Sequence, residues 1–228
     1  MLEHDKPLYR HAAPLLELVR QYRHEFSRPG FAATLLVSVA AFACAIALNF
    51  FAIKRATEKA GSSVPDIILS NIPVFEVDGL FVYGTFVFVL CTLFLILGRP
   101  RRIPFALHAV TLFYVVRSMF TLLTHLGPPE VYYVSDFGVT ITRAFFGADQ
   151  FFSAHTGMPF LGALVFWSRP YIRYFFLTGS AFFAVIVLLG HIHYSIDVAA
   201  AFFITYVVFL WARRLFAKEF ALFSAGDK

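Results

Sequence analysis

Two histidines and an aspartate at the entrances of two apolar segments are the residues of this chain best suited to chemistry. His193 and Asp197 are four residues apart, so on a helix they share one face. A carboxylate in that position holds one imidazole nitrogen and leaves the other free to act as a nucleophile. His155 opens another apolar segment and supplies the proton donor that such a reaction needs.

The composition predicts an all-α, polytopic membrane protein. The 228 residues are 59% hydrophobic and only 14% charged, a balance typical of helices that cross a bilayer. Ionisable groups are costly in such a setting, so the three residues above are functional candidates by default. The alternative is a structural pair of histidines at the membrane interface, where an amphipathic ring can contact both lipid and water.

Six apolar segments predict six transmembrane helices. The last three are short for a hydrocarbon core of about 30 Å, so their ends are the least defined. The six segments are Phe31–Phe51, Gly79–Leu97, Ile103–Leu123, Phe151–Trp167, Tyr174–Gly190 and Ile196–Ala212.

The basic residues predict the orientation of these helices. Fourteen of them lie before the first segment, after the second and fourth segments, and in the C-terminal tail, whereas four lie on the opposite side. An excess of Lys and Arg marks the cytoplasmic side, so both termini are expected there. The candidate site then faces the exoplasmic side, meaning the periplasm or a lumen. The net charge of +5 is thus a topology signal and does not indicate a nucleic-acid partner.

Three regions follow from this pattern. Residues 1–30 form a cytoplasmic arm, which is either an amphipathic helix on the membrane surface or an extended solvated segment. Residues 31–214 form a six-helix catalytic domain in the membrane, and residues 215–228 form a cytoplasmic tail.

The histidine motifs resemble those of the sphingomyelin synthases, within the type 2 phosphatidic acid phosphatase superfamily. The family pattern Gly-Asp-x-x-Phe-Ser-Gly-His-Thr corresponds to residues 148–156, with Ala148 and Ala154 in place of its glycines. The pattern His-Tyr-Ser/Thr-x-Asp-Val is matched throughout by residues 193–198. Weaker similarities follow the same order along the chain. They are Asp66 in a Pro-Asp motif, Arg117 within the third segment, and Thr124, Leu126 and Pro129 after it.

This resemblance implies a lipid phosphotransferase that works through a phosphohistidine on His193. A phosphocholine or phosphoethanolamine head group would pass from a glycerophospholipid donor to a lipid alcohol acceptor, ceramide or diacylglycerol. The alternative is hydrolysis at the same site, as a phospholipase C or a lipid phosphate phosphatase. A transporter or scaffold is a third class, which would keep its function without the two histidines. No His, Cys, Asp or Glu cluster has metal-ligand spacing, so the sequence predicts metal-independent chemistry without a cofactor.

One position departs from the phosphatase branch of the superfamily. That branch has an arginine six residues before the nucleophilic histidine, and here the position is Val187. Another group must therefore neutralise the phosphoryl oxygens. Arg117, inside the third segment, is the first candidate, unless it pairs with a structural carboxylate such as Glu76 or Asp149.

Six further residues are weaker candidates for the site. Arg143 is a second possible phosphate ligand or an interface anchor, and Ser153 and Thr156 are expected to add donors at a helix N-terminus. Asp149 either contributes to binding or caps the helix that follows. Glu76 either binds an amine head group or is an ordinary loop acid. Asp66 is expected to shape its loop.

Overall fold

The structure is a computed structural model that describes residues 7–130 and 151–225, with side chains from Pro14 onward. All of its secondary structure in these residues is helical, which confirms the all-α prediction. The α-helices are α1 (Pro7–Phe26), α2 (Phe31–Glu58), α3 (Asp78–Leu97), α4 (Ile103–Leu123), α6 (Ala154–Val165), α7 (Pro170–Leu189), α8 (Ser195–Leu215) and α9 (Ala217–Ala225). Two short 3₁₀ turns complete the set, η1 (Leu69–Asn71) and η2 (Pro100–Arg102).

Five of the described helices are long and apolar enough to cross a membrane: α2, α3, α4 with η2, α7 and α8. This finding supports an integral membrane protein. The fourth expected segment is different, because α6 has only 12 residues and so spans about 18 Å. The segment shortens because Phe151 and Phe152 are not helical and Ser153 is the N-cap of α6.

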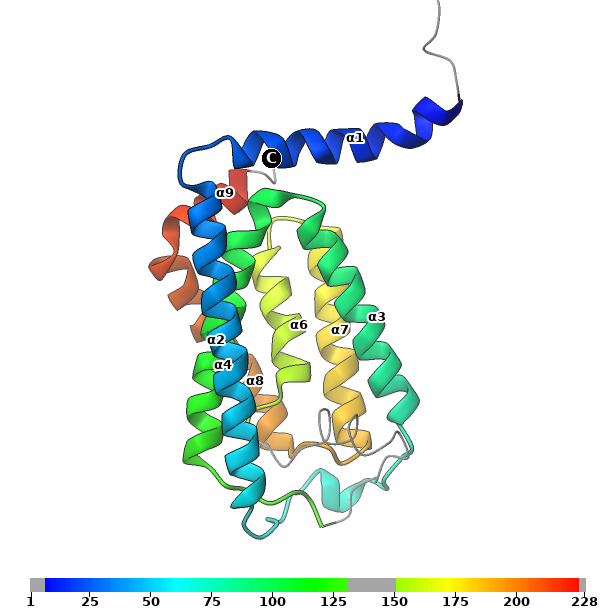
Figure 1. The fold of residues 1–228 in the computed structure, drawn as a ribbon. Helices are drawn as coiled ribbons and strands as arrows, with labels where there is room; N and C mark the ends of the chain where they lie inside the picture. The colour runs from blue at the N-terminus through cyan, green and yellow to red at the C-terminus, as the bar shows by residue number, and fades with distance from the viewer. Residues whose placement is uncertain (1–6, 131–150, 226–228) are drawn as a thin grey trace, which may run out of the picture.

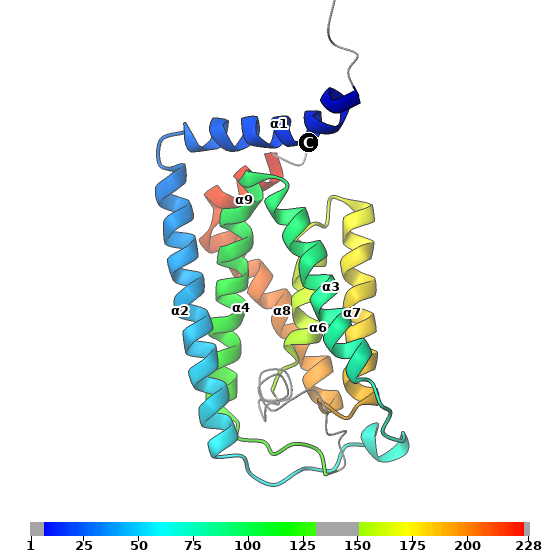
Figure 2. The same ribbon diagram turned by 45° about the vertical axis from the view of Figure 1, so that its right-hand side comes forward.

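The long helices run side by side and alternate in direction (Figure 1). Helix α1 and helix α9 lie at one end of the bundle, so the described chain starts and finishes on the same side (Figures 1 and 2). The loops that follow α2 and α4 and the turn between α7 and α8 lie at the other end. Candidate site residues on these loops are therefore gathered far from the termini.

Helices α2 and α4 pack along their length because α2 presents small residues to its neighbour. Ser38, Ala45 and Ala52 follow one another at intervals of seven residues, and all are buried. Small side chains at such intervals allow two helices in a membrane to approach closely. The Ser38 hydroxyl also lies 3.1 Å from Nδ1 of His108 on α4, which adds a polar contact within this interface.

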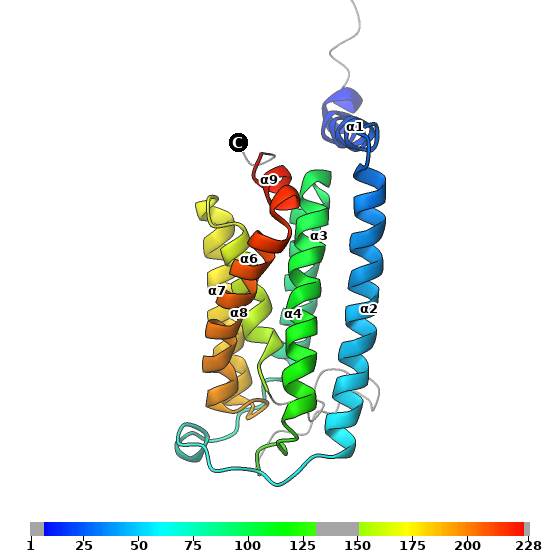
Figure 3. The same ribbon diagram turned by 90° about the vertical axis from the view of Figure 1, so that its left-hand side faces the viewer.

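Helix α6 lies at the centre of the bundle, packed against α7 and α8 and in contact with α4 (Figure 3). Gly157 permits this position, because a Cβ there would lie 2.8 Å from Oγ1 of Thr205 and 2.9 Å from the ring of Phe113. A helix that is covered by other helices does not need the full thickness of a bilayer. Its N-terminus can then lie deeper in the bundle than the ends of its neighbours.

The C-terminal segment that we expected to be a tail contains α9, which packs against the bundle. Phe223 of α9 is 1% exposed and contacts the rings of Phe105 and Phe166, at centroid distances of 5.8 and 5.1 Å. The last described turn of the chain is therefore part of the apolar core at this end.

Candidate active site

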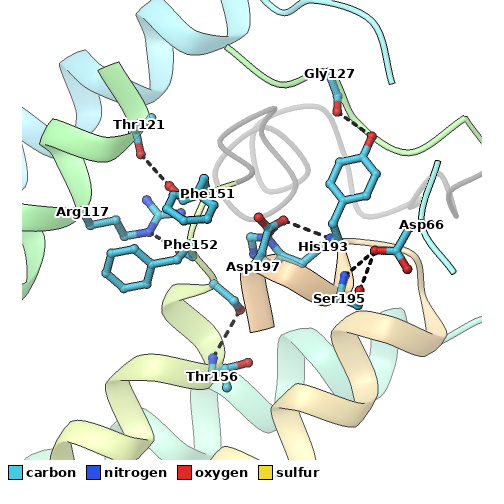
Figure 4. A network of polar contacts seen from close by, with 12 residues as sticks. Asp66, Arg117, Thr121, Gly127, Phe151, Phe152, Thr156, His193, Ser195 and Asp197 are labelled. Atoms are coloured by element: carbon cyan, nitrogen blue, oxygen red, sulfur yellow. Dashed lines mark hydrogen bonds and ion pairs between the residues drawn. The ribbon is translucent and has the colours of Figure 1, made fainter. Parts of the chain in front are cut away.

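The predicted catalytic residues come together at the end of the bundle away from the termini, and Figure 4 shows two of them, His193 and Asp197. His193 lies in the turn between α7 and α8, Asp197 in the first turn of α8, and His155 in the first turn of α6. Arg117 reaches toward them from the C-terminal half of α4. Three regions that are distant in sequence thus contribute to one site.

His193 and Asp197 are buried in direct contact with each other, although not as two residues on one helix. Helix α8 begins at Ser195, so His193 precedes it by two residues, and the expectation of a shared helix face is wrong. Asp197 instead reaches back from the first turn. Its Oδ2 lies 3.5 Å from Nδ1 of His193 and accepts a hydrogen bond from the backbone N–H of Tyr194 at 2.9 Å.

This local geometry has a simple cause. An acid three residues after the N-cap commonly accepts a hydrogen bond from the N-cap backbone, and Tyr194 is the N-cap of α8. The same reach that caps the helix places the carboxylate beside His193. Both side chains are buried, Asp197 completely. Because Nδ1 of His193 faces Asp197, Nε2 is the ring nitrogen left for chemistry.

His155 packs its ring against Phe81 of α3, at a centroid distance of 4.4 Å, and lies near Phe183 of α7. It is close enough to His193 and to Arg117 for electrostatic interaction with both. The structure therefore brings the two histidines together, one from α6 and one from the turn before α8, within electrostatic range of the guanidinium of Arg117.

Arg117 is 3% exposed and anchors the segment that leads into α6. Its Nε donates to the carbonyl of Phe152 at 3.0 Å, and its Nη1 donates to Oδ1 of Asn49 at 3.3 Å. Thr121, one turn further along α4, donates to the carbonyl of Phe151 at 3.3 Å. Two side chains of α4 thus fix the non-helical residues before His155.

The structure gives the other predicted binding residues different roles. Ser153 caps α6, since its Oγ accepts from the N–H of Thr156 at 3.4 Å, so Asp149 is not needed for that role. Thr156 is buried and its hydroxyl has no hydrogen-bond partner within the described part of the chain. Glu76 is exposed, and residues 14–130 and 151–225 show no ion pair for it, which removes it as the partner of Arg117. Asp149 and Arg143 lie outside the described residues.

Asp66 ties the loop that follows α2 to the start of α8. Its Oδ2 accepts hydrogen bonds from the N–H and the hydroxyl of Ser195, at 2.7 and 2.8 Å, and its Oδ1 accepts from the N–H groups of Ile68 and Leu69. Burial opposes ionisation of Asp66, but these hydrogen bonds outweigh it and hold the pKa of the carboxyl below its ordinary value. The geometry agrees with the expectation that Asp66 shapes its loop.

Tyr194 is a residue of the site that sequence reasoning overlooked. Its side chain is 1% exposed, and its hydroxyl donates to the carbonyl of Gly127 at 2.9 Å and accepts from the N–H of Val64 at 3.2 Å. Burial raises the pKa of this phenol, so it remains a neutral donor. Its position between His193 and Ser195 was the only signal in the sequence.

The two loops that Tyr194 joins also contact each other. Gly61 donates to the carbonyl of His125 at 2.8 Å, and Gly127 donates to that of Ser62 at 3.3 Å. A Cβ on Gly127 would collide with the carbonyl oxygen of Gly61, so this approach requires glycine. The turn that carries His193 is therefore held by two loops that are themselves bound together.

Two further groups near the site, Asp78 and His191, are buried. Asp78, the first residue of α3, is 5% exposed, and its Oδ1 has no hydrogen-bond partner among the residues that the structure describes. It lies one turn before Phe81, which contacts His155, and a negative charge there is favourable at a helix N-terminus. His191 is 5% exposed and has a φ of 51°, an uncommon conformation for a residue other than glycine. No group of three or more His, Cys, Asp or Glu in the described ranges could hold a metal ion.

A comparison with known families bears on this site. Residues 147–214, which include α6, α7 and α8, match the family described as PAP2 superfamily C-terminal. The match supports the type 2 phosphatidic acid phosphatase superfamily. It covers His155, His193 and Asp197 but under a third of the chain. No curated protein and no solved structure gave a significant match.

The Asp66 hydrogen bonds lead to a prediction about stability. Asp66→Asn should lower the free energy of unfolding by about 1–3 kcal/mol at neutral pH, because the amide offers one acceptor where two are used. The folded-state pKa of Asp66 is below its unfolded value of about 3.9, so its stabilisation is complete above that value. It is lost as the pH falls through the folded-state pKa.

Thermal unfolding of the purified protein, followed from pH 7 down to pH 3, tests this. The difference in thermal stability between the wild type and Asp66→Asn should shrink as the pH falls. Glu76→Gln, which removes an exposed carboxylate on the same side of the protein, is the matched control and should change little. An equal effect of the two substitutions would show that the Asp66 contacts do not stabilise the loop.

Proposed function

We propose that the protein transfers a phospholipid head group to a lipid alcohol through a phosphohistidine on His193. The family match supports lipid chemistry of the phosphatase or phosphotransferase type. The observation that carries the proposal is the buried His193–Asp197 pair with His155 and Arg117 beside it. The donor would be a glycerophospholipid with a phosphocholine or phosphoethanolamine head group, and the acceptor ceramide or diacylglycerol.

In the first step, Nε2 of His193 attacks the phosphorus atom and forms a nitrogen–phosphorus bond. The bond between phosphorus and the diacylglycerol oxygen breaks, and His155 as imidazolium gives its proton to that oxygen. Asp197 holds the Nδ1–H of His193 and stabilises the positive charge on the ring.

In the second step the acceptor hydroxyl enters, and His155, now neutral, takes its proton. The oxygen attacks phosphorus, the nitrogen–phosphorus bond breaks, and the electron pair returns to Nε2 of His193. The site is then back in its starting state. Splitting the displacement in this way allows one site to exchange one lipid alcohol for another.

Electrostatics favour an anionic substrate at this place. Arg117 and the two histidines lie close together in a largely buried site. In a site shielded from water, a guanidinium attracts an anion more strongly than it does in water. A phosphodiester supplies one negative charge, and the transition state places more on its oxygens, where Arg117 can stabilise it.

The valine at position 187 departs from the phosphatase signature and so supports transfer chemistry of the synthase type. It occupies the position of the phosphatase arginine, and the structure places it, fully buried, in an apolar cluster with Val77, Phe81 and Val198. A cation has no place in that cluster. Hydrolysis by water at the same phosphohistidine remains the second candidate, because it requires the same residues.

We further propose that α2, α3, α4, α6, α7 and α8 form six membrane segments with both termini in the cytoplasm. The grouping of α1 and α9 at one end, together with the excess of basic residues there, supports this orientation. The short α6 is compatible with it because its neighbours cover it. The active site would then face the exoplasmic side.

The first functional prediction concerns His193. His193→Ala should reduce turnover at least about 100-fold, since a lost nucleophile costs no less than a lost general acid–base group. Asp197→Asn should cost less, because the histidine remains but loses its orienting charge. Purified protein is incubated with glycerophospholipid labelled in the head group, with and without ceramide or diacylglycerol, and the labelled products are counted.

The same assay separates the candidate functions. Labelled lipid product that depends on the acceptor supports transfer, whereas labelled water-soluble product supports hydrolysis. Label bound covalently to the wild-type protein when acceptor is left out should disappear with His193→Ala. Full activity of the His193→Ala protein would exclude the phosphohistidine. Absence of any labelled product with the wild type would leave a transporter or scaffold as the remaining class.

Arg117 provides a second prediction. Arg117→Ala should lower turnover by about 10²–10³-fold, the effect of removing one donor that stabilises an oxyanion. Arg117→Lys should keep part of the activity, because it keeps the charge but loses the planar fork. Thr121→Val is the control, since it removes a neighbouring hydrogen bond to the same segment without changing the charge. If Thr121→Val and Arg117→Ala lose activity equally, Arg117 only supports the segment.

The third prediction concerns sidedness. A cysteine replacing Ser62 in the first outer loop should react with a membrane-impermeant thiol reagent added outside the cell. One replacing Ser168, between α6 and α7, should react only after the membrane is opened. Both serines are exposed, so accessibility in the protein itself is matched. The opposite labelling pattern would place the site in the cytoplasm.

A further inference from the structure

Helix α1 lies across the end of the bundle, with its axis at a steep angle to the long helices (Figures 1 and 2). Because the long helices are the candidate membrane spans, α1 runs roughly parallel to the membrane plane at the level of their ends. Figure 3 places it above α2, at the edge of the bundle. A helix in this position is next to the lipid head groups.

Polar contacts fix which side of α1 faces the protein. Glu25 is 2% exposed, and it accepts from Nε of Arg101 at 2.6 Å and pairs with Nη1 of Arg28 at 3.1 Å. Burial opposes its ionisation, but the hydrogen bonds from Arg101 and His24 outweigh this and keep its pKa below the ordinary value. The hydroxyl of Tyr22 donates to the carbonyl of Leu97, at the end of α3, at 2.9 Å.

The side of α1 next to these contacts carries an exposed apolar strip. At about 100° per residue, Leu15, Val19 and Phe26 fall within about 40° of one another, and Leu16 extends the strip. These four side chains are 64%, 45%, 49% and 58% exposed, in the order Leu15, Val19, Phe26 and Leu16. An apolar strip of this kind on an amphipathic helix at the membrane level is suited to the acyl boundary.

The charge at this end of the protein indicates the kind of lipid. Arg20 and Arg23 lie at the edge of the strip, where long side chains can keep their stems in an apolar setting and their charges in the head-group layer. Eleven basic residues and three acidic ones, Glu17, Glu25 and Glu219, are described at this end. The basic residues are Arg20, Arg23, Arg28, Arg99, Arg101, Arg102, Arg169, Arg173, Arg213, Arg214 and Lys218.

A cavity beside α1 has room for a lipid head group. Its volume is about 360 Å³, and Arg20, Arg99 and Arg101 contribute to its lining. Glu17 and Glu25 also line it, but each is already paired with an arginine, at 3.5 Å from Arg20 and 2.6 Å from Arg101. The excess positive charge around the cavity therefore attracts phosphate groups.

We propose that α1 is a docking surface for anionic phospholipids of the membrane in which the bundle lies. The apolar strip rests in the acyl boundary of the leaflet, and Arg20 and Arg23 contact the lipid phosphates. Through Glu25 and Tyr22, this lipid contact is linked to the turns that begin α4 and end α3. The inference concerns the end of the bundle opposite the candidate active site and does not depend on the reaction proposed there.

The test uses the full chain in vesicles of phosphatidylglycerol and phosphatidylcholine in equal parts. Cys44 and Cys91 are replaced by alanine, and a single cysteine labelled with bimane is introduced as Val19→Cys in the strip. The matched control is Glu17→Cys, also exposed but on the opposite side of α1. Bromine atoms on the acyl chains of one lipid or the other quench the fluorophore on contact, so no turnover is needed.

We expect quenching at least about twofold stronger at position 19 than at position 17, and stronger with brominated phosphatidylglycerol than with brominated phosphatidylcholine. Arg20→Gln with Arg23→Gln should abolish the preference between the lipids and leave the quenching at position 19. Equal, weak quenching at both positions would overturn the proposal in favour of a solvated or protein-binding helix. Equal quenching by the two lipids would also overturn it, because the surface would then not select anionic lipid.

Discussion

The site depends on one buried carboxylate. Asp197 lies in the first turn of α8, where its side chain accepts from the backbone of Tyr194 and pairs with His193, while its backbone carbonyl accepts from the N–H of Ser153 at 3.2 Å. The first two contacts cap α8 and orient the histidine, and the third attaches the segment before α6. A neutral or shorter side chain at position 197 would weaken both the cap of α8 and the contact that orients the imidazole of His193. Capping and chemistry are therefore served by the same group.

Hydrogen bonds across loops keep this arrangement in place. Asp66 holds the start of α8, and Tyr194 joins the loops that follow α2 and α4. Arg117 and Thr121 fix the residues that enter α6. Each contact pairs a side chain with a backbone group of a loop or a helix end, so the loops and the helix ends stabilise one another. This rigidity suits an enzyme that must hold two histidines at a defined separation.

The bundle is polarised between its two ends. One end carries the candidate site, in which acids and histidines are buried. The other carries α1, α9 and most of the arginines, with Glu25 as a buried centre of ion pairs. The short α6 lies between them, and Gly157 allows it to pack closely against α8 and α4. Its recessed N-terminus brings His155 to the level of a site that lies inside the bundle.

The sequence by itself determined the helical class, the positions of most helices and the pairing of His193 with Asp197, because hydropathy, periodicity and short spacings are local properties. It did not show that Asp197 reaches back from the first turn of α8 to His193, that α6 has only 12 residues, or that Arg117 binds the carbonyl of Phe152. Nor did it show Tyr194 as a link between loops, or the Asp66–Ser195 contact between residues 129 positions apart. Only the tertiary structure decided these features, because a hydrogen bond between distant segments depends on how the helices pack and leaves no local pattern in the chain.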